Sequence, residues 1–205
     1  MAEKEAFWKK NASFSKEKLA KILRLKNLTI SEVRHFSNVY NWERIGLRAS
    51  DDRLIPILFR APVKADKEII ILGIPYKKLH IQHSVMLENL INEGYGIAII
   101  DLWGAGENDL RIDTSYRDRF LNRSLMWLGK NLQGKWVEDF FLVEKYLLKR
   151  FPKAVLAAGG YDDGTIAATL FAALRDAKTD LYLKRPPVSL GYSPARSKRS
   201  VDSVV

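Results

Sequence analysis

Short apolar runs recur along the middle of the chain. A run without polar alternation is expected of a strand that is buried on both faces of a sheet. Such runs occupy residues 68–73, 96–101 and 154–158, and a fourth strand is expected at 180–183. The segments between them carry apolar residues at helical spacing, at 81–93, 136–150 and 165–174. Strands that alternate with helices predict an α/β fold, with a mostly parallel twisted sheet and helices on both faces.

The N-terminal part of the chain has a different pattern. Ser15 is placed to cap an amphipathic helix, and Ser31 is placed to cap a second short turn or helix. Two strand-like runs follow at residues 42–49 and 54–60. Pro56 predicts that the second of these runs lies near a sheet edge or at a bulge, because proline cannot donate to a ladder.

The chain changes in composition after Lys184. The remaining residues are basic, rich in Ser and Pro, and without periodicity, as expected of a flexible tail. We therefore predict a helical lead-in at residues 1–40, an α/β domain at 41–184 and a basic tail at 185–205.

The overall composition narrows the function classes. A length of 205 residues with 47% hydrophobic residues suits one domain with a sizeable core. No apolar run is long enough to span a membrane, and the first residues lack the pattern of a secretory signal, so we expect a cytoplasmic protein. The absence of cysteine excludes disulfides and thiol chemistry. The net charge is +10, but Lys and Arg are scattered and accompany no recognised motif, so we do not expect a nucleic-acid partner.

One turn carries the strongest functional signal. Gly160-Tyr161-Asp162-Asp163-Gly164 lies between an apolar run and a predicted helix. A strand, a Gly-x-nucleophile-x-Gly turn and a helix together form a nucleophile elbow, in which the glycines allow a sharp turn that holds out the central side chain. That central residue is normally Ser, and here it is Asp162.

Two further segments have the order and spacing of one superfamily whose members have such an elbow. Gly94-Tyr95-Gly96, a strand, Asp101 and then Gly104-x-Gly106 resemble its "GY-strand-D-x-x-G-x-G" stretch. Residues 129–139 resemble its G-x-x-x-x-G-x-x-x-x-D entry to the helix before the elbow strand. Residues 40–190 thus resemble the α/β-hydrolase superfamily, in its acetyl xylan esterase-like and dienelactone-hydrolase-like branches. The resemblance implies an α/β-hydrolase fold and an esterase-like ancestry.

The chain also departs from that family's pattern. The family places a histidine after the nucleophile, whereas His35, His80 and His83 all precede Asp162. The family sheet has about eight strands, and six strand-like runs are recognised here. We therefore expect an α/β-hydrolase fold that is short at its C-terminus, in a degenerate or truncated hydrolase that lacks conventional Ser-His-Asp activity. The basic tail also fits a fragment of a longer protein, in which case the missing groups lie downstream.

Two roles for Asp162 stay open. In the first, Asp162 is a nucleophile toward small esters or related electrophiles, which is similar to haloalkane dehalogenases and epoxide hydrolases. His80 or a partner chain would then have to supply the base. In the second, Asp162 and Asp163 cap the following helix, because carboxylates satisfy free N–H groups and complement the helix dipole there. We favour the second role, which leaves open whether the chain is an enzyme.

The resemblance also implies the surroundings of Asp162. The loop after the first apolar run, with Ile74 and Tyr76, should help to form the oxyanion hole. Tyr161, Asp163 and Trp103 should line the pocket, because ligands bind at the carboxyl ends of strands in such sheets.

The remaining candidates indicate no cofactor. Asp101 is expected to fix the Gly104-x-Gly106 loop, which does not fit a dinucleotide-binding pattern. His80 and His83 without a third ligand are poor support for zinc. Nothing in the sequence implies a metal or an organic cofactor. The expected partners are a small-molecule ester ligand and a second copy of the chain, bound through an exposed sheet edge.

Overall fold

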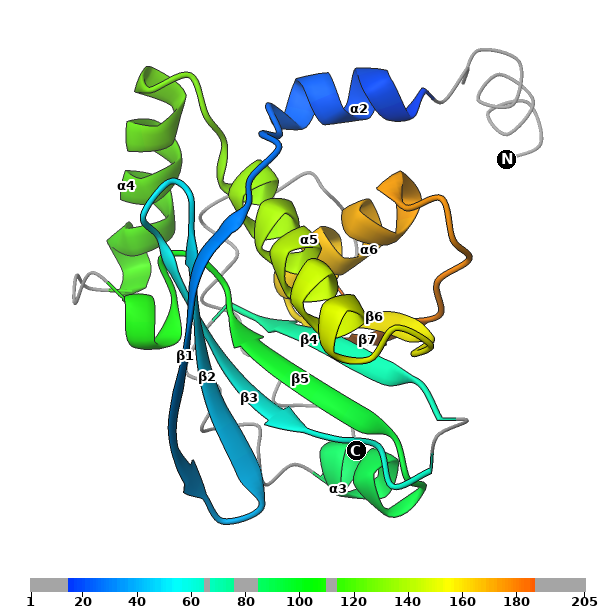
Figure 1. The fold of residues 1–205 in the computed structure, drawn as a ribbon. Helices are drawn as coiled ribbons and strands as arrows, with labels where there is room; N and C mark the ends of the chain where they lie inside the picture. Colours follow the sequence, from blue (N-terminus) through cyan, green and yellow to red (C-terminus); the bar gives the residue numbers. More distant parts are fainter. Residues whose placement is uncertain (1–14, 65–66, 76–84, 110–113, 187–205) are drawn as a thin grey trace, which may run out of the picture.

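The computed structural model contains a seven-stranded sheet with helices on both faces (Figure 1). The structure describes residues 15–64, 67–75, 85–109 and 114–186, with the backbone alone for residues 114–119. The strands are β1 (Ile30–Val39), β2 (Trp42–Ala49), β3 (Leu54–Arg60), β4 (Ile69–Ile74), β5 (Gly96–Asp101), β6 (Leu156–Tyr161) and β7 (Leu181–Lys184). The helices are α2 (Lys16–Leu23), α3 (Val85–Asn92), α4 (Thr114–Trp127), α5 (Leu132–Arg150) and α6 (Gly164–Leu174), with a 3₁₀ turn, η2, at Gly106–Asn108.

The strand order in the sheet is β1-β2-β3-β5-β4-β6-β7. The pairs β1–β2, β2–β3 and β3–β5 are antiparallel, whereas the pairs β5–β4, β4–β6 and β6–β7 are parallel. The four parallel strands lie at the apolar runs that predicted them. The expected α/β class, with a parallel core and helices on both faces, is therefore confirmed.

Apolar layers cover both faces of the parallel strands. Along β4, Ile69 and Ile71 belong to the core cluster under α5 and α6, whereas Ile70 and Leu72 belong to the cluster that contains Leu87 of α3. Because successive side chains of a strand point to opposite faces, a strand covered on both sides must be apolar at every position. This is the physical reason for the continuous apolar runs in the sequence.

The N-terminal part differs from its prediction. Residues 30–39 form β1, which pairs with β2 as a hairpin at one edge of the sheet, so the helical lead-in of residues 1–40 is wrong for this part. Ser31 caps no helix, since it lies within β1, where its hydroxyl donates to the Arg48 carbonyl at 3.1 Å. The sequence did not predict β1, because this edge strand is mostly exposed and its polar residues form no apolar pattern.

One smaller prediction was also wrong, and one helix was missed. Pro56 lies in an interior strand, β3, and is tolerated because the pairing of β3 with β5 begins only at Ile57. Helix α4 was not predicted, since the exposed positions described at its C-terminal end include large apolar residues such as Trp127, which is 82% exposed.

A buried cluster of charges joins α5 to the turn between β2 and β3. The Arg53 guanidinium contacts Glu138 at 2.5 Å, Asp139 at 2.9 Å and Asp51 at 3.1 Å. The Lys135 ammonium contacts Asp51 at 2.9 Å and Glu138 at 3.0 Å. Arg53 and Lys135 are almost fully buried, and so are the two acidic residues of α5, Glu138 and Asp139. Burial of this kind is tolerated only when every charge is paired and hydrogen-bonded.

Two further hydrogen bonds extend the cluster to distant segments. Asp139 accepts from the backbone N–H of Trp103, which follows β5, at 3.0 Å. Glu138 accepts from the backbone N–H of Lys26, which follows α2, at 2.7 Å. The cluster therefore holds four separate parts of the chain together. The Asp139 of the G-x-x-x-x-G-x-x-x-x-D motif thus has a structural role.

We predict that Arg53→Met strongly destabilises the protein. Removal of the guanidinium leaves the Glu138 and Asp139 carboxyl groups buried without their main partner, which costs about 3–5 kcal/mol of unfolding free energy. Urea titration followed by circular dichroism measures this loss. The matched control is Arg48→Met, because the Arg48–Glu32 ion pair is exposed and should be worth less than about 1 kcal/mol. Equal losses for the two variants would contradict the structural role of the cluster.

We also predict a pH dependence that arises from Asp139. Burial raises the pKa of Asp139 to about 7, against the opposing effects of Arg53 and the Trp103 N–H. The folded protein then holds a proton that the unfolded chain releases at the ordinary aspartate pKa of 3.8, so stability falls as the pH rises from about 3.8 to about 7. Unfolding free energies of wild type and Asp139→Asn, measured from about pH 5 to about pH 8, should converge at low pH and diverge as the pH rises. A constant difference between them would refute the shift.

Candidate functional site

The chain turns sharply between β6 and α6. Strand β6 ends at Tyr161, and Asp162 follows with a φ of 45°, in the left-handed region that a side chain rarely adopts. Asp163 returns to ordinary helical angles and α6 begins at Gly164. This strand, turn and helix have the form that the Gly160–Gly164 sequence predicts.

Two glycines allow the tight packing of this turn. A Cβ atom on Gly160 would overlap the backbone of Gly164, and a Cβ atom on Gly164 would overlap the carbonyl oxygen of Gly73 in β4. Helix α6 therefore begins directly against the backbones of β4 and β6. Only glycine permits this approach, which explains both ends of the Gly-x-x-x-Gly motif.

Backbone hydrogen bonds hold Asp162 in its unusual conformation. Its N–H donates to the Lys184 carbonyl of β7 at 3.0 Å. Its carbonyl accepts from the Thr165 N–H at 3.0 Å and from the Thr165 hydroxyl at 2.5 Å. The surrounding strands and helix thus impose the positive φ, and strain of this kind is often found at functional sites.

The side chains of the two aspartates do not cap α6. Asp163 is the N-cap residue, yet its side chain makes no capping hydrogen bond. Among the described residues, the Asp162 carboxylate has no hydrogen bond or ion pair either. Partial burial raises the pKa of Asp162, and the charge of Arg185 opposes that rise. The hydrogen-bonding part of the capping hypothesis is therefore wrong, and its helix-dipole part stays a prediction.

The turn lies where the order in which the chain adds strands to the sheet reverses. From β4 the chain passes through α3 to β5 on one side, whereas from β6 it passes through α6 to β7 on the other side. Helices α3 and α6 pack on opposite faces of the sheet (Figure 1). The carboxyl ends of β4 and β6 thus flank a topological switch point, which is where ligands bind in open α/β sheets.

Other predicted site residues are found in different surroundings. Ile74 is fully buried in the core cluster on the α3 face, and Tyr161 is 7% exposed in the same cluster. Trp103 is half-buried after β5, and its carbonyl accepts from the Trp136 indole N–H at 2.9 Å. Tyr76 lies outside the described residues.

The histidines contribute no described group to the turn. His35 is exposed on β1, and β2, β3, β5 and β4 lie between that strand and β6. His80 and His83 lie outside the described residues. Asp101 accepts from the Glu107 N–H at 3.0 Å and thereby holds η2, which confirms that it fixes the glycine loop.

Comparison with known proteins supports the fold. No family model and no curated protein matches this chain. Among solved structures, a putative acetyl xylan esterase from Bacteroides fragilis NCTC 9343 has a TM-score of 0.61 at 16% identity, and the match covers 78% of this chain and 49% of that chain. Acetyl Xylan Esterase 1 from Thermoanaerobacterium sp. JW/SL YS485 has a TM-score of 0.51 at 13% identity, with 78% and 53% covered. A cold-adapted esterase from an Arctic intertidal metagenomic library has a TM-score of 0.51 at 18% identity, with 73% and 63% covered.

This chain has an α/β-hydrolase fold. It spans about half the length of the two acetyl xylan esterase structures. At these identities, the likeness establishes the fold alone.

Two features of this α/β-hydrolase fold were not predicted from the sequence. The Lys184 ammonium lies 5.5 Å from the centre of the Tyr161 ring, and the Arg185 charge acts on Asp162. Both follow from the parallel pairing of β6 and β7, which sets Tyr161 opposite Lys184. No local motif indicates these contacts, since Lys184 ends the predicted α/β domain and Arg185 begins the predicted basic tail.

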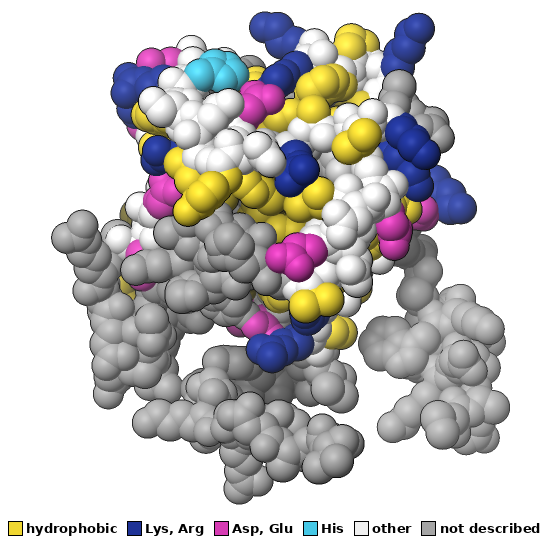
Figure 2. All heavy atoms as spheres, turned by 90° about the horizontal axis from the view of Figure 1, so that it is seen from below, with side chains coloured by type: hydrophobic (Ala, Val, Ile, Leu, Met, Phe, Trp, Pro, Cys, Tyr) yellow, Lys and Arg dark blue, Asp and Glu magenta, His cyan; other side chains and the backbone are white. Residues whose placement is uncertain are grey.

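Other features of the described residues bear on ligands and partners. These residues contain no group of three or more His, Asp or Glu side chains that could hold a metal ion. None of their helices is long and apolar enough to cross a membrane. Basic and acidic side chains are interspersed over the face drawn in Figure 2.

We predict opposite effects of glycine at the two aspartates. Asp162→Gly should stabilise the protein by about 1 kcal/mol, because glycine adopts a positive φ without the steric cost of a side chain. Asp163→Gly should not stabilise it, because Asp163 has a φ of −64°, where glycine only adds freedom to the unfolded chain. Urea titration of both variants measures the difference. A loss of stability in Asp162→Gly would show that the aspartate side chain supports the fold.

Proposed function

We propose that this chain is an esterase-like protein of the α/β-hydrolase fold that keeps a small-molecule ester site at the Asp162 turn but lacks conventional Ser-His-Asp activity. The observation that carries the proposal is the strained Asp162 backbone at the switch point, with a carboxylate that is not used for capping. In α/β-hydrolases this turn holds the nucleophile, and the backbone N–H of the next residue contributes to the oxyanion hole. Asp162 and Asp163 take these two positions in the proposal.

The chemistry of Asp162 argues against ordinary ester hydrolysis. A carboxylate that attacks an ester carbonyl forms an anhydride while the ester C–O bond breaks and the alcohol leaves, and water must then be activated to hydrolyse the anhydride. None of the three histidines follows Asp162 in the sequence, and the described one is remote on β1. The chain by itself therefore has no described base for that step.

A second candidate function is a hydrolase with Asp162 as its nucleophile. The carboxylate is half-buried and unpaired among the described residues, so an oxygen lone pair is available. Attack on an sp³ carbon of an epoxide would form a C–O ester bond while the ring C–O bond breaks and its oxygen leaves with the electron pair. Without a base to activate water, this alkyl ester would persist on the protein.

We predict that wild-type protein turns over short-chain nitrophenyl esters no faster than Asp162→Asn. Nitrophenolate release measures this rate, and Asp163→Asn serves as the matched control for a lost charge at the same turn. Incubation with a small epoxide followed by intact-protein mass spectrometry tests the second candidate. A stoichiometric adduct in wild type and Asp163→Asn that is absent from Asp162→Asn would support the nucleophile and displace the first proposal.

The retained ester site can be tested without turnover. N-butylacetamide, which resembles a short ester but resists hydrolysis, should shift the amide NMR signals of residues 161–164 in wild type. If only amides remote from this turn respond, the proposed ligand site is wrong.

A further inference from the structure

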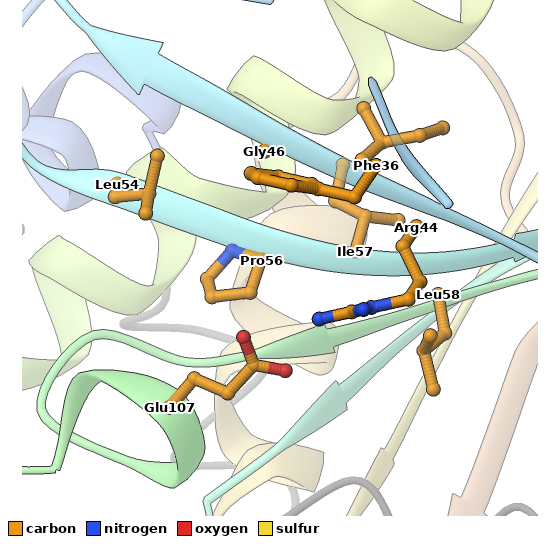
Figure 3. A pocket seen from close by; sticks show the side chains of 9 residues that line it. Phe36, Arg44, Gly46, Leu54, Pro56, Ile57, Leu58 and Glu107 are labelled. Carbon is orange, nitrogen blue, oxygen red and sulfur yellow. The ribbon is translucent and has the colours of Figure 1, made fainter. Parts of the chain in front are cut away.

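A hollow lies on the sheet face formed by β1, β2 and β3 (Figure 3). Its volume is about 140 Å³. An apolar cavity of about 150 Å³ accommodates benzene, so this hollow has the size of one six-membered ring. Strands β5 and β4 separate β3 from β6, which places the hollow apart from the Asp162 turn.

Apolar groups form most of its lining. Gly46 leaves room for the Phe36 ring, since a Cβ atom on Gly46 would lie 3.2 Å from that ring. Leu54 and Pro56 of β3 line the hollow beside them (Figure 3). Phe36 is 48% exposed and Leu54 is 36% exposed. These apolar surfaces remain open to solvent, and a flat ligand would bury them.

Two opposite charges lie at the hollow. The Arg44 guanidinium carbon is 5.7 Å from the centre of the Phe36 ring, and the Arg44 side chain makes no ion pair or hydrogen bond among the described residues. Its neighbour along the strand, Arg48, is already paired with Glu32. Glu107 of η2 also lines the hollow, and its side chain extends toward Pro56 and Arg44 (Figure 3).

We propose that this hollow binds a single-ring aromatic carboxylate. The ligand carboxylate pairs with the fork of Arg44, which suits two parallel hydrogen bonds. The ring packs against Phe36 and Pro56. A hydroxyl on the ring donates to the Glu107 carboxylate, whose negative charge disfavours a second anionic group beside it. Recognition therefore requires one anionic group for Arg44, a ring for the apolar lining and one donor for Glu107.

Titration with 4-hydroxybenzoate, followed by amide NMR, tests this proposal. We expect saturable shifts in β1, β2 and β3 with a Kd of about 1 mM or below. Arg44→Met should weaken binding at least about tenfold, and Gly46→Val should abolish it by filling the hollow. Arg34→Met is the matched control, because Arg34 lies on the adjacent strand but does not line the hollow, and its affinity should equal that of wild type. Phenol, which lacks the carboxylate, should bind wild type and Arg44→Met equally.

Three outcomes would overturn the proposal. They are the absence of saturation at about 10 mM ligand, unchanged affinity in Arg44→Met, and loss of binding in Asp162→Asn. The last outcome would place the ligand at the turn after β6. Because binding in the hollow does not require Asp162, its result is independent of the ester assays.

Discussion

The packing of distant segments of this chain depends on the paired charges around Arg53. One guanidinium joins the turn between β2 and β3 to α5, and the carboxylates of α5 reach the segments after α2 and after β5. The cluster contains two cations, Arg53 and Lys135, and three carboxyl groups, so full ionisation leaves an excess negative charge in a buried site. That imbalance and the burial of Asp139 act in the same direction on its pKa. Stability in this region is therefore tied to protonation.

The candidate site depends on a different constraint, which is backbone contact. Gly164 begins α6 directly against the Gly73 carbonyl of β4, and Gly160 admits the first turn of the helix. These contacts leave Asp162 with a positive φ and an uncommitted carboxylate at the carboxyl edge of the sheet. The turn thus consists of a strand, a residue with positive φ and a helix, with an aspartate at its centre.

The edge of the sheet at β1 has features that oppose pairing with another chain. The register between β1 and β2 is irregular between Ile30 and Glu32 and again between Phe36 and Val39. Charged side chains, including Glu32 and Arg34, lie on the strand between these irregularities. Bulges and charges are common means of protecting an exposed edge. Homo-oligomerisation through a sheet edge remains a prediction, and β1 provides a poor surface for it.

The sequence alone determined the parallel core, the turn and the fold class, because these depend on local patterns. Strands buried on both faces must be continuously apolar, and close backbone contact at the turn requires Gly160 and Gly164. Strand β1 was not predicted, because an exposed edge strand does not require an apolar pattern in its sequence. Only the tertiary structure showed that the Asp163 side chain makes no capping hydrogen bond, that Arg53 contacts Asp139, and that Lys184 lies beside Tyr161. These facts depend on contacts between residues distant in sequence, which local periodicity does not encode.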